Sequence, residues 1–423
     1  MAKKTINKEL TGAQDLYNFL FEACNIIRGP VSQDNFKDYI TPLLYYKRIS
    51  DVYDEETEEA LISSGGDKEY ASLPEQHRFV IPDGCHWQEV RERTENLGAA
   101  IVGAMRQIEI ANPDTLYGVL SMFSSQKWTN KAILNDSKIR DLIEHLSKRK
   151  LGNKDYPADL MGDAYEILLK KFADDSKAQA GEFYTPRSVV RLLVHILDPQ
   201  PGETVYDPAC GSGGMLIEAI RYMHDDSLCC GSIFGQEKNV VNAAIAKMNL
   251  FLHGASDFNV MQGDTLRDPK ILQGGNIAKF DCVIANPPFS LENWGATEWS
   301  SDKYKRNIYG TPSDSCGDYA WIQHMICSMS SGKGRMAVVM PQGILFRGNQ
   351  EAEIRKQLVE SDLIEAVVTL GDKLFYGTGL SPCFLIIRRM KPAHHSGRIL
   401  MIDGSKILTQ KRAQNILEEN DID

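Results

Sequence analysis

The amino-acid sequence predicts an α/β protein with a doubly wound, mostly parallel sheet and a separate N-terminal helical domain. Two observations carry this prediction. After about residue 200, short apolar runs alternate with helical stretches, the pattern of parallel strands joined by helices. Before residue 165, apolar residues recur at helical spacing instead. We therefore divide the 423 residues into a helical domain (1–165), an α/β domain (166–400) and the start of a C-terminal tail (401–423).

The composition is that of a soluble globular protein, with 43% hydrophobic and 25% charged residues. The polar start and the lack of any apolar run of about 18 residues predict a cytoplasmic protein with no membrane contact. The 9 cysteines form no Cys-x-x-Cys pair, so we expect no metal site and no disulfide framework. The net charge of −10 argues against a protein that grips nucleic-acid phosphates alone.

The helical domain is predicted from two runs of apolar residues that fall on one helix face. Gly29-Pro30 should end the first run, and Pro42 should kink or restart the second. Residues 53–87 are acidic and interrupted by Gly and Pro, so we expect helix ends and loops there. The apolar positions are Leu16, Phe19, Leu20, Ala23, Cys24, Ile27, Phe36, Tyr39, Ile40, Leu43 and Leu44.

The α/β domain is predicted from seven short apolar runs with four helical stretches between them. The strands are expected at 204–206, 232–235, 258–261, 282–285, 336–340, 366–370 and 383–387. The helices are expected at 215–223, 240–252, 321–329 and 352–360. This alternation implies helices on both faces of the sheet.

A glycine-rich loop, Asp207–Gly214, directly follows the first predicted strand and precedes a helix. Its glycines allow a sharp turn and a close approach of a ligand to the backbone. Glu237 ends the next predicted strand, where a carboxylate accepts both hydroxyls of a ribose. Asp207 suits an ammonium group better than a pyrophosphate. Ribose and ammonium together indicate S-adenosylmethionine, with a ligand-free turn as the alternative.

The tetrapeptide Asn286-Pro287-Pro288-Phe289 follows a predicted buried strand. The prolines stiffen the turn, and ligands bind at the carboxyl ends of parallel strands. The amino nitrogen of adenine is a poor nucleophile because its lone pair is delocalised into the ring. The side-chain oxygen of Asn286 and the carbonyl of Pro287 would bond its two hydrogens and stabilise the developing positive charge. Phe289 would stack on a flipped base; a rigid turn with a packed Phe is the alternative.

Two further segments are candidates for cofactor binding. Residues 182–187 run Glu182-Phe183-Tyr184-Thr185-Pro186-Arg187 into an apolar helix, with Thr185 as the expected N-cap and Pro186 at the first helical position. The helix N-terminus would face the cofactor carboxylate; a capped helix with packed aromatics is equally supported. Asp264, at the end of the third strand, would accept from the cofactor adenine, or would only cap a turn.

The loop from Ser290 to Ser313 interleaves basic and aromatic residues, which suits nucleic acid. It is the strongest basic patch in an acidic chain, and a solvated flexible loop is the alternative. The residues concerned are Trp294, Trp299, Lys303, Tyr304, Lys305, Arg306 and Tyr309.

Taken together, these motifs resemble an amino-methyltransferase of the gamma arrangement, in which a Phe-x-Thr-Pro-like segment precedes the glycine loop. More narrowly, the chain resembles the modification (M) subunit of type I restriction–modification systems over nearly its whole length. The segments Ile27–Gly29, Tyr46–Asp51, Phe346–Gly348 and Leu374–Gly379 add to the resemblance.

The resemblance implies a Rossmann-like fold that binds S-adenosylmethionine through Glu182 to Arg187, Ser212, Gly213, Gly214 and Glu237. It implies catalysis of N6-adenine methylation by Asn286 to Phe289. The implied partners are double-stranded DNA, a specificity (S) subunit, a restriction (R) subunit and a second M subunit. Base readout by the S subunit would account for the acidic net charge.

The family's chains usually continue through a longer helical tail, so we expect either truncation after Asp423 or a short variant of the family. Two alternatives stay open at this point. One is an amino-group methyltransferase acting on RNA or a protein glutamine, since Asn-Pro-Pro-aromatic serves those reactions too. The other is a non-catalytic DNA-binding scaffold with the same fold.

Overall fold

The structure is a computed structural model that describes residues 2–116, 118–120, 125–157, 160–165, 167–168, 185–223, 231–255, 257–375, 381–410 and 415–422. The chain forms two compact units. The first comprises residues 1–178 with 247–254, and the second comprises 179–246 with 255–423. The domain limits expected at residues 165 and 400 stay predictions.

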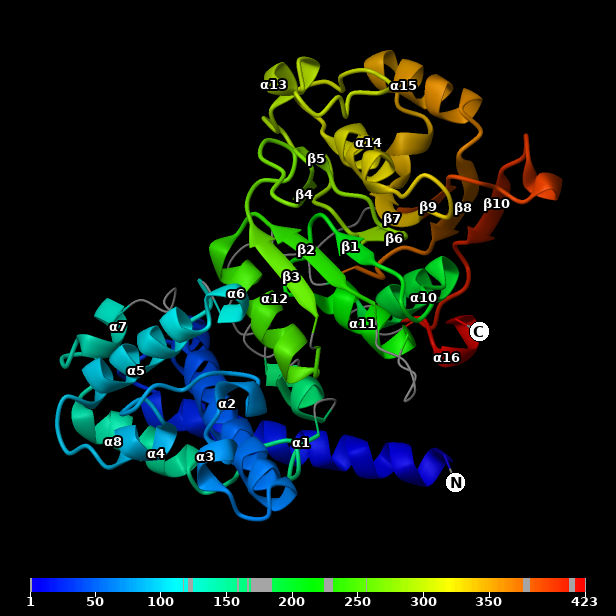
Figure 1. Cartoon of the computed structure of the whole chain (residues 1–423). Coiled ribbons are helices and arrows are strands. Elements are labelled where there is room, and N and C mark those ends of the chain that lie inside the picture. Colours follow the sequence, from blue (N-terminus) through cyan, green and yellow to red (C-terminus); the bar gives the residue numbers. More distant parts are fainter. Residues whose placement is uncertain are drawn as a thin grey trace. The chain divides into compact units, whose positions relative to one another are not determined.

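The first unit is built from helices, drawn mainly in blue and cyan in Figure 1. Its long members are α1 and α2, which are joined by a short 3-10 turn at Gln33–Asn35. The helices in the described part are α1 (Ala2–Ile27), α2 (Lys37–Ser63), α3 (Lys68–Ala71), α4 (Trp87–Arg91), α5 (Leu97–Ala111), α6 (Pro113–Leu116), α7 (Ser125–Thr129) and α8 (Asp136–Leu146).

The expected restart of the helix at Pro42 is wrong, because α2 runs from Lys37 through Pro42 to Ser63, and the expected kink stays a prediction. Every residue from 39 to 52 is buried, so packing on all sides of the helix outweighs the hydrogen bond that the proline removes. The expected end of the first helical run is confirmed, since α1 stops at Ile27, before Gly29-Pro30.

A group of buried charges lies inside α2. Arg48 is 2% exposed and donates to the carbonyls of Gly152 (2.6 Å) and Tyr156 (2.9 Å) and to Leu151. Lys47 and Asp51 form a buried ion pair one helical turn apart. The carboxylate of Asp51 also accepts from the Leu151 backbone N–H at 2.7 Å. These charges are therefore fully engaged in joining α2 to the segment after α8.

The second unit contains an eight-stranded sheet in the order β10-β8-β9-β7-β6-β1-β2-β3. Neighbouring strands are parallel except at β9, which runs antiparallel to both β7 and β8. The bounds are β1 (Val205–Asp207), β2 (Ile233–Glu237), β3 (Phe258–Gln262), β6 (Cys282–Ala285), β7 (Arg335–Pro341), β8 (Ile364–Leu370), β9 (Pro382–Arg388) and β10 (Leu400–Gly404).

The predicted doubly wound, mostly parallel sheet is confirmed, and each of the seven predicted strands overlaps an observed one. The four predicted helices are confirmed as well. They are α11 (Gly214–Met223), α12 (Val240–Leu252), α14 (Asp318–Ser328) and α15 (Asn349–Glu360). The sequence did not predict β10 or the small hairpin of β4 (Leu272–Gln273) and β5 (Asn276–Ile277), although Gly274-Gly275 supplies its turn.

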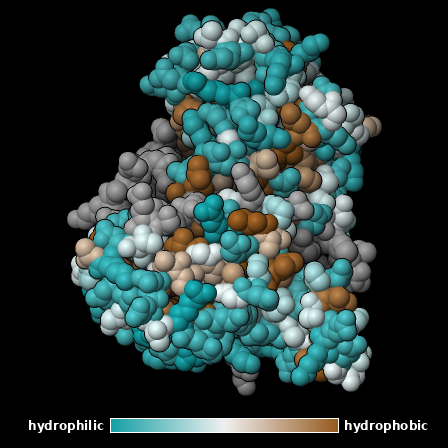
Figure 2. Space-filling view, turned by 60° about the vertical axis from the view of Figure 1, so that its left-hand side comes forward, coloured by the Kyte–Doolittle hydropathy of each residue, from teal (hydrophilic) through white to brown (hydrophobic). Residues whose placement is uncertain are grey.

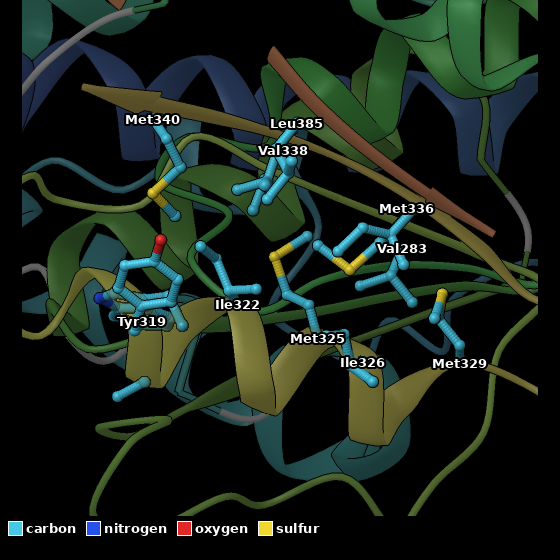
Figure 3. Packing of buried hydrophobic residues seen from close by; sticks show 14 of the residues in the cluster. Val283, Tyr319, Ile322, Met325, Ile326, Met329, Met336, Val338, Met340 and Leu385 are labelled. Atoms are coloured by element: carbon cyan, nitrogen blue, oxygen red, sulfur yellow. The ribbon is translucent and has the colours of Figure 1, made fainter. Parts of the chain in front are cut away.

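Helices cover both faces of this sheet (Figure 1). On one face α10 (Arg187–Leu197) packs against β6 and β7. On the other, α14 contributes Tyr319, Ile322, Met325, Ile326 and Met329 to a core with the alternate strand residues Val283, Met336, Val338, Met340 and Leu385 (Figure 3). All of β7 is buried, as expected of a strand in the middle of a sheet that helices cover on both faces.

The visible surface is largely hydrophilic, with hydrophobic residues in small groups (Figure 2). None of the helices in the described ranges combines the length and the low polarity that a membrane span requires. The cytoplasmic location stays a prediction.

Candidate active site

The candidate site lies at the topological switch point of the sheet, between β1 and β6, where the strand order reverses. From β1 the chain proceeds outward to β2 and β3, and it then returns to β6 on the other side of β1. The two strands pair directly, with Val205 opposite Cys282 and Tyr206 opposite Val283. The loops that leave their carboxyl ends therefore start side by side, which is where open α/β sheets bind ligands.

The glycine loop leaves β1 at this point. Gly211 (φ +52°) and Gly213 (φ +86°) adopt left-handed backbone conformations that favour glycine. A Cβ on Gly235 of β2 would stand 3.0 Å from both the Cys210 sulfur and a Leu216 methyl carbon. The glycines thus let the loop turn sharply and lie close to the next strand.

Two acidic side chains meet at the loop. Glu237 accepts from the Gly211 N–H at 3.0 Å and from the Asn239 N–H at 2.7 Å. Asp207 is 2% exposed and accepts from the Ala209 N–H at 2.9 Å. Burial, opposed by that hydrogen bond and aided by the nearby charge of Glu237, raises the pKa of Asp207 to about 8. No Lys or Arg in the described part of the chain forms an ion pair with Asp207.

Asn286 follows β6 and carries the most informative atom of the site. Its Nδ2 donates to Thr185 Oγ1 at 2.8 Å, which fixes the orientation of the amide. Its Oδ1 is buried, and no described residue donates to it. Buried polar atoms are nearly always paired, so an unpaired acceptor indicates a place for a ligand donor.

The turn after Phe289 is held by a chain of polar contacts from Ser290 through Asp318 to Arg347, which the sequence did not predict. We call this chain of contacts the Ser290–Arg347 relay. Ser290, in the left-handed region (φ +49°), donates its N–H to Asp318 Oδ1 at 2.7 Å. The other oxygen of Asp318, a fully buried residue, accepts from Arg347, which also pairs with Glu351 at 3.2 Å. The sequence shows only the acid that begins α14, because the left-handed turn at Ser290 is seen in the structure alone and the two residues are 28 positions apart.

The remaining predicted cofactor residues have mixed outcomes. Thr185 is not the N-cap: Pro186 is, and the helix begins at Arg187, because the Thr185 hydroxyl is engaged with Asn286. Asp264 accepts from the N–H groups of Leu266 and Arg267 and pairs with Lys238 at 2.8 Å. Ser212 lies in the glycine loop and Gly214 opens α11. Glu182, Phe183 and Tyr184 lie outside the described residues, and the roles of all these residues stay predictions.

The tetrapeptide directly follows β6, the strand after which the sequence places it. Pro287 is buried, Pro288 is exposed and Phe289 is partly exposed. Asn286 and Thr185 are brought together although they are 101 positions apart. The structure thus gathers the glycine loop, Glu237, Thr185 and Asn286 at one edge of the sheet.

The segment from 290 to 313 is not the structureless loop that the sequence predicts. It contains α13 (Ala296–Ser300), and Trp294 and Trp299 are each 2% exposed. Arg306 is 1% exposed and bonds Asp302 and the backbone oxygens of Thr265 and Leu266. These residues are structural, and Lys303 and Lys305 alone keep exposed charges among its basic residues.

Comparison with known families divides the chain into two matches. Residues 16–146 match the HsdM N-terminal domain, and residues 156–423 match the N-6 DNA methylase family. This chain is 34% identical to two methylase subunits of Methanocaldococcus jannaschii, those of the type I restriction enzymes MjaVII and MjaVIII. The two alignments cover 89% and 94% of this chain, respectively. The chain spans about two thirds of the length of these subunits, 66% and 69%.

A solved structure agrees with these sequence matches. The type I restriction-modification system methyltransferase subunit from Streptococcus thermophilus aligns with a TM-score of 0.80 at 26% sequence identity. The alignment covers 97% of this chain and 91% of that one, so the similarity includes both compact units.

Proposed function

Because this chain belongs to the N-6 DNA methylase family and to the methylase subunits of type I restriction enzymes, we propose that it methylates N6 of adenine in duplex DNA with S-adenosylmethionine as donor. The resemblance found in the sequence is thereby confirmed. The observation that carries the proposal is the buried Oδ1 of Asn286, which has no donor among the described residues and lies at the switch point next to the acidic glycine loop.

The residues of the glycine loop fit the donor. Asp207 is a buried carboxyl that lacks a cation among the described residues, and the donor's ammonium group would supply one. Glu237, at the end of β2, would accept from the ribose hydroxyls. The left-handed Gly211 and Gly213 keep side chains away from the donor. When bound, the donor supplies an electrophilic methyl group on a sulfonium.

Asn286 and Pro287 would prepare the acceptor nitrogen. The Oδ1 of Asn286 would accept one amino hydrogen of adenine, and the carbonyl of Pro287 would accept the other. Both acceptors are fixed before the reaction, since Thr185 orients the amide and the prolines stiffen the turn. They stabilise the positive charge that develops on the nitrogen without needing to reorganise. Phe289 would stack on the extruded base.

We further propose that the chain works as the modification subunit of a larger complex. Its net charge of −10 gives no surplus of cations for phosphate contacts, and burial of Arg306 removes one cation from the surface. A specificity subunit would therefore provide most of the base readout, with a second copy of this chain and a restriction subunit completing the assembly.

The test is methyl transfer from labelled S-adenosylmethionine, with the chain and its specificity subunit offered duplex DNA, RNA or protein. We expect label on adenine N6 of the duplex alone. Label on RNA or on a protein glutamine would overturn the proposal. Donor binding without transfer to any of the three would support the scaffold alternative instead.

A further inference from the structure

Phe346 is the most exposed large hydrophobic residue in the part of the chain that the structure describes, at 74%. Isolated apolar side chains on a surface are common, so exposure alone decides nothing. Two features distinguish Phe346. Hydrogen bonds fix the turn that carries it, and polar contacts connect this turn to the one after Phe289.

The turn that carries Phe346 is anchored on both sides. The Ile344 carbonyl accepts from the Tyr319 hydroxyl at 2.7 Å and from Arg355 at 3.2 Å. Arg355 also donates to the Arg347 carbonyl at 2.8 Å. Tyr319 is itself part of the core beneath β7 (Figure 3). The aromatic ring is therefore held out into solvent by a fixed turn.

The turn lies beside the proposed catalytic tetrapeptide. β7 pairs with β6, and it extends beyond the register position of Ala285 before the chain enters the turn at Gln342. The Ser290–Arg347 relay then connects the two loops directly. Phe289 precedes one end of this relay and Phe346 precedes the other, so the relay fixes both aromatic residues to the same edge.

Exposed lysines lie on two segments that are joined to this turn, and one of them, α15, also carries the exposed Glu353. Gln357 of α15 donates to the Tyr309 carbonyl at 3.3 Å, which joins α15 to the segment carrying Lys303 and Lys305. Lys356 is exposed on α15. The acidic Glu351 of the same helix is neutralised by Arg347. Phosphate groups next to an inserted ring would meet lysines here.

We propose that Phe346 enters the duplex and stacks on the base pair next to the extruded adenine; this inference rests on the proposed function. Removing a base from a duplex costs stacking and pairing. An apolar wedge held at a fixed place offsets that cost by stacking in the gap. Phe289 would hold the base outside the helix, and Phe346 would hold the helix open.

The test uses the complex with its specificity subunit and the substitutions Phe346→Ala and Phe346→Trp. On fully paired DNA, Phe346→Ala should lower kcat/KM by about tenfold or more, the loss expected for one aromatic stacking contact. On DNA with an abasic site opposite the target adenine, the loss should shrink to about threefold or less, since extrusion is cheaper there. Phe346→Trp should retain most of the activity.

A second readout reports extrusion itself. With 2-aminopurine at the target position, the wild-type complex should increase its fluorescence, and Phe346→Ala should not. Met390→Ala is the matched control, because Met390 is 69% exposed but follows the antiparallel strand β9, which ends at the opposite edge of the sheet. It should leave both readouts unchanged.

Three outcomes would overturn the inference. Phe346→Ala could behave like Met390→Ala on paired DNA, or it could lose the same factor on paired and abasic DNA. If instead the wild-type complex methylates no duplex at all, the proposed function fails first and the inference fails with it.

Discussion

Two regions of the molecule, the buried charges of α2 and the carboxyl edge of the sheet, pair their buried polar groups in opposite ways. Within α2, the charges of Lys47, Arg48 and Asp51 are buried, and each is matched by a counter-charge or by backbone groups. At the sheet edge, Asp207 keeps a buried carboxyl with one backbone donor, and the Oδ1 of Asn286 has no donor among the described residues. Satisfied groups hold a fold in place, whereas unsatisfied ones are held ready for a ligand.

The contrast separates two motifs that look equally functional in the sequence. Tyr46–Asp51 and Asn286–Phe289 both mix polar and apolar residues, and both resemble the same family. In the structure, the first is internal to the helical unit, and the second ends a strand at the switch point. Substitutions in the first motif should therefore lower stability, and substitutions in the second should lower activity.

The largest effect should come from Asn286→Ala, which should lower the rate of methyl transfer and leave the stability of the fold nearly unchanged. We expect kcat to fall about 10²–10³-fold, the range for loss of one preorganised group at a developing charge. The free energy of unfolding should change by no more than about 1 kcal/mol, because one hydrogen bond to Thr185 is all that is lost. Methylation assays, calorimetry of donor binding and thermal unfolding measure the three quantities. Loss of donor binding as well would contradict the assignment.

Arg48→Met should do the reverse and act on stability. Several buried carbonyls would lose their donor together, so we expect at least about 3 kcal/mol of destabilisation of the helical unit. Denaturant unfolding followed by hydrogen exchange of α2 measures it. Arg48→Lys keeps the charge and should restore part of the loss. Unchanged stability with lost methylation would mean that this segment has a direct role in the reaction.

Asp207→Asn should weaken donor binding about tenfold to hundredfold, the value of a hydrogen bond to a charged group. In the wild type, the raised pKa of Asp207, about 8, means that most sites are protonated at pH 7. Donor affinity should therefore rise from pH 6 to 8, with proton release on binding. Titration calorimetry in buffers of different ionisation enthalpy measures both, and an affinity independent of pH would count against Asp207.

The same variant should also change how the free energy of unfolding depends on pH. A carboxyl whose pKa is raised by folding favours the folded state at low pH, and it loses that contribution as the pH rises through about 8. The donor-free Asp207→Asn protein should therefore be the more stable one at pH 9, with an advantage that shrinks at pH 5 and disappears below the ordinary pKa of 3.8. Thermal unfolding at the two pH values tests it.

The smallest effect should come from Thr185→Val, which leaves Oδ1 intact but removes the partner of Nδ2. The amide of Asn286 would then rotate, and kcat should fall about fivefold with KM for DNA unchanged, as for one neutral hydrogen bond. Thr185→Ser keeps the hydroxyl and should retain full kcat. Equal losses in both variants would show that the hydroxyl does not orient the amide.

Local patterns in the sequence were sufficient for most of the α/β unit. The strand Cys282–Ala285 and the helix Val240–Leu252 were predicted with the observed bounds, because each is an apolar stretch with polar residues at both ends. β10 was missed, since it is a short edge strand whose apolar residues are exposed rather than alternating.

Contacts between distant residues could not be predicted. The cations of 303–306 look alike in sequence, but Arg306 is drawn inside by Asp302 and by carbonyls about 40 residues earlier. Pro42 should restart a helix on local grounds, but α2 continues through it because residues 39–52 are buried on every side. For the site, spacing identified Asp207, Glu237 and Asn286, whereas the Ser290–Arg347 relay depends on tertiary neighbours.

The hydrogen bond between Thr185 and Asn286 also has a consequence for biosynthesis. It joins two points 101 residues apart, with β1, β2 and β3 between them. A nascent chain that has emerged from the ribosome only as far as β3 already contains the glycine loop, but it lacks the amide that would aim at the target base. The arrangement proposed for catalysis is therefore completed late in synthesis, after a long-range contact has closed.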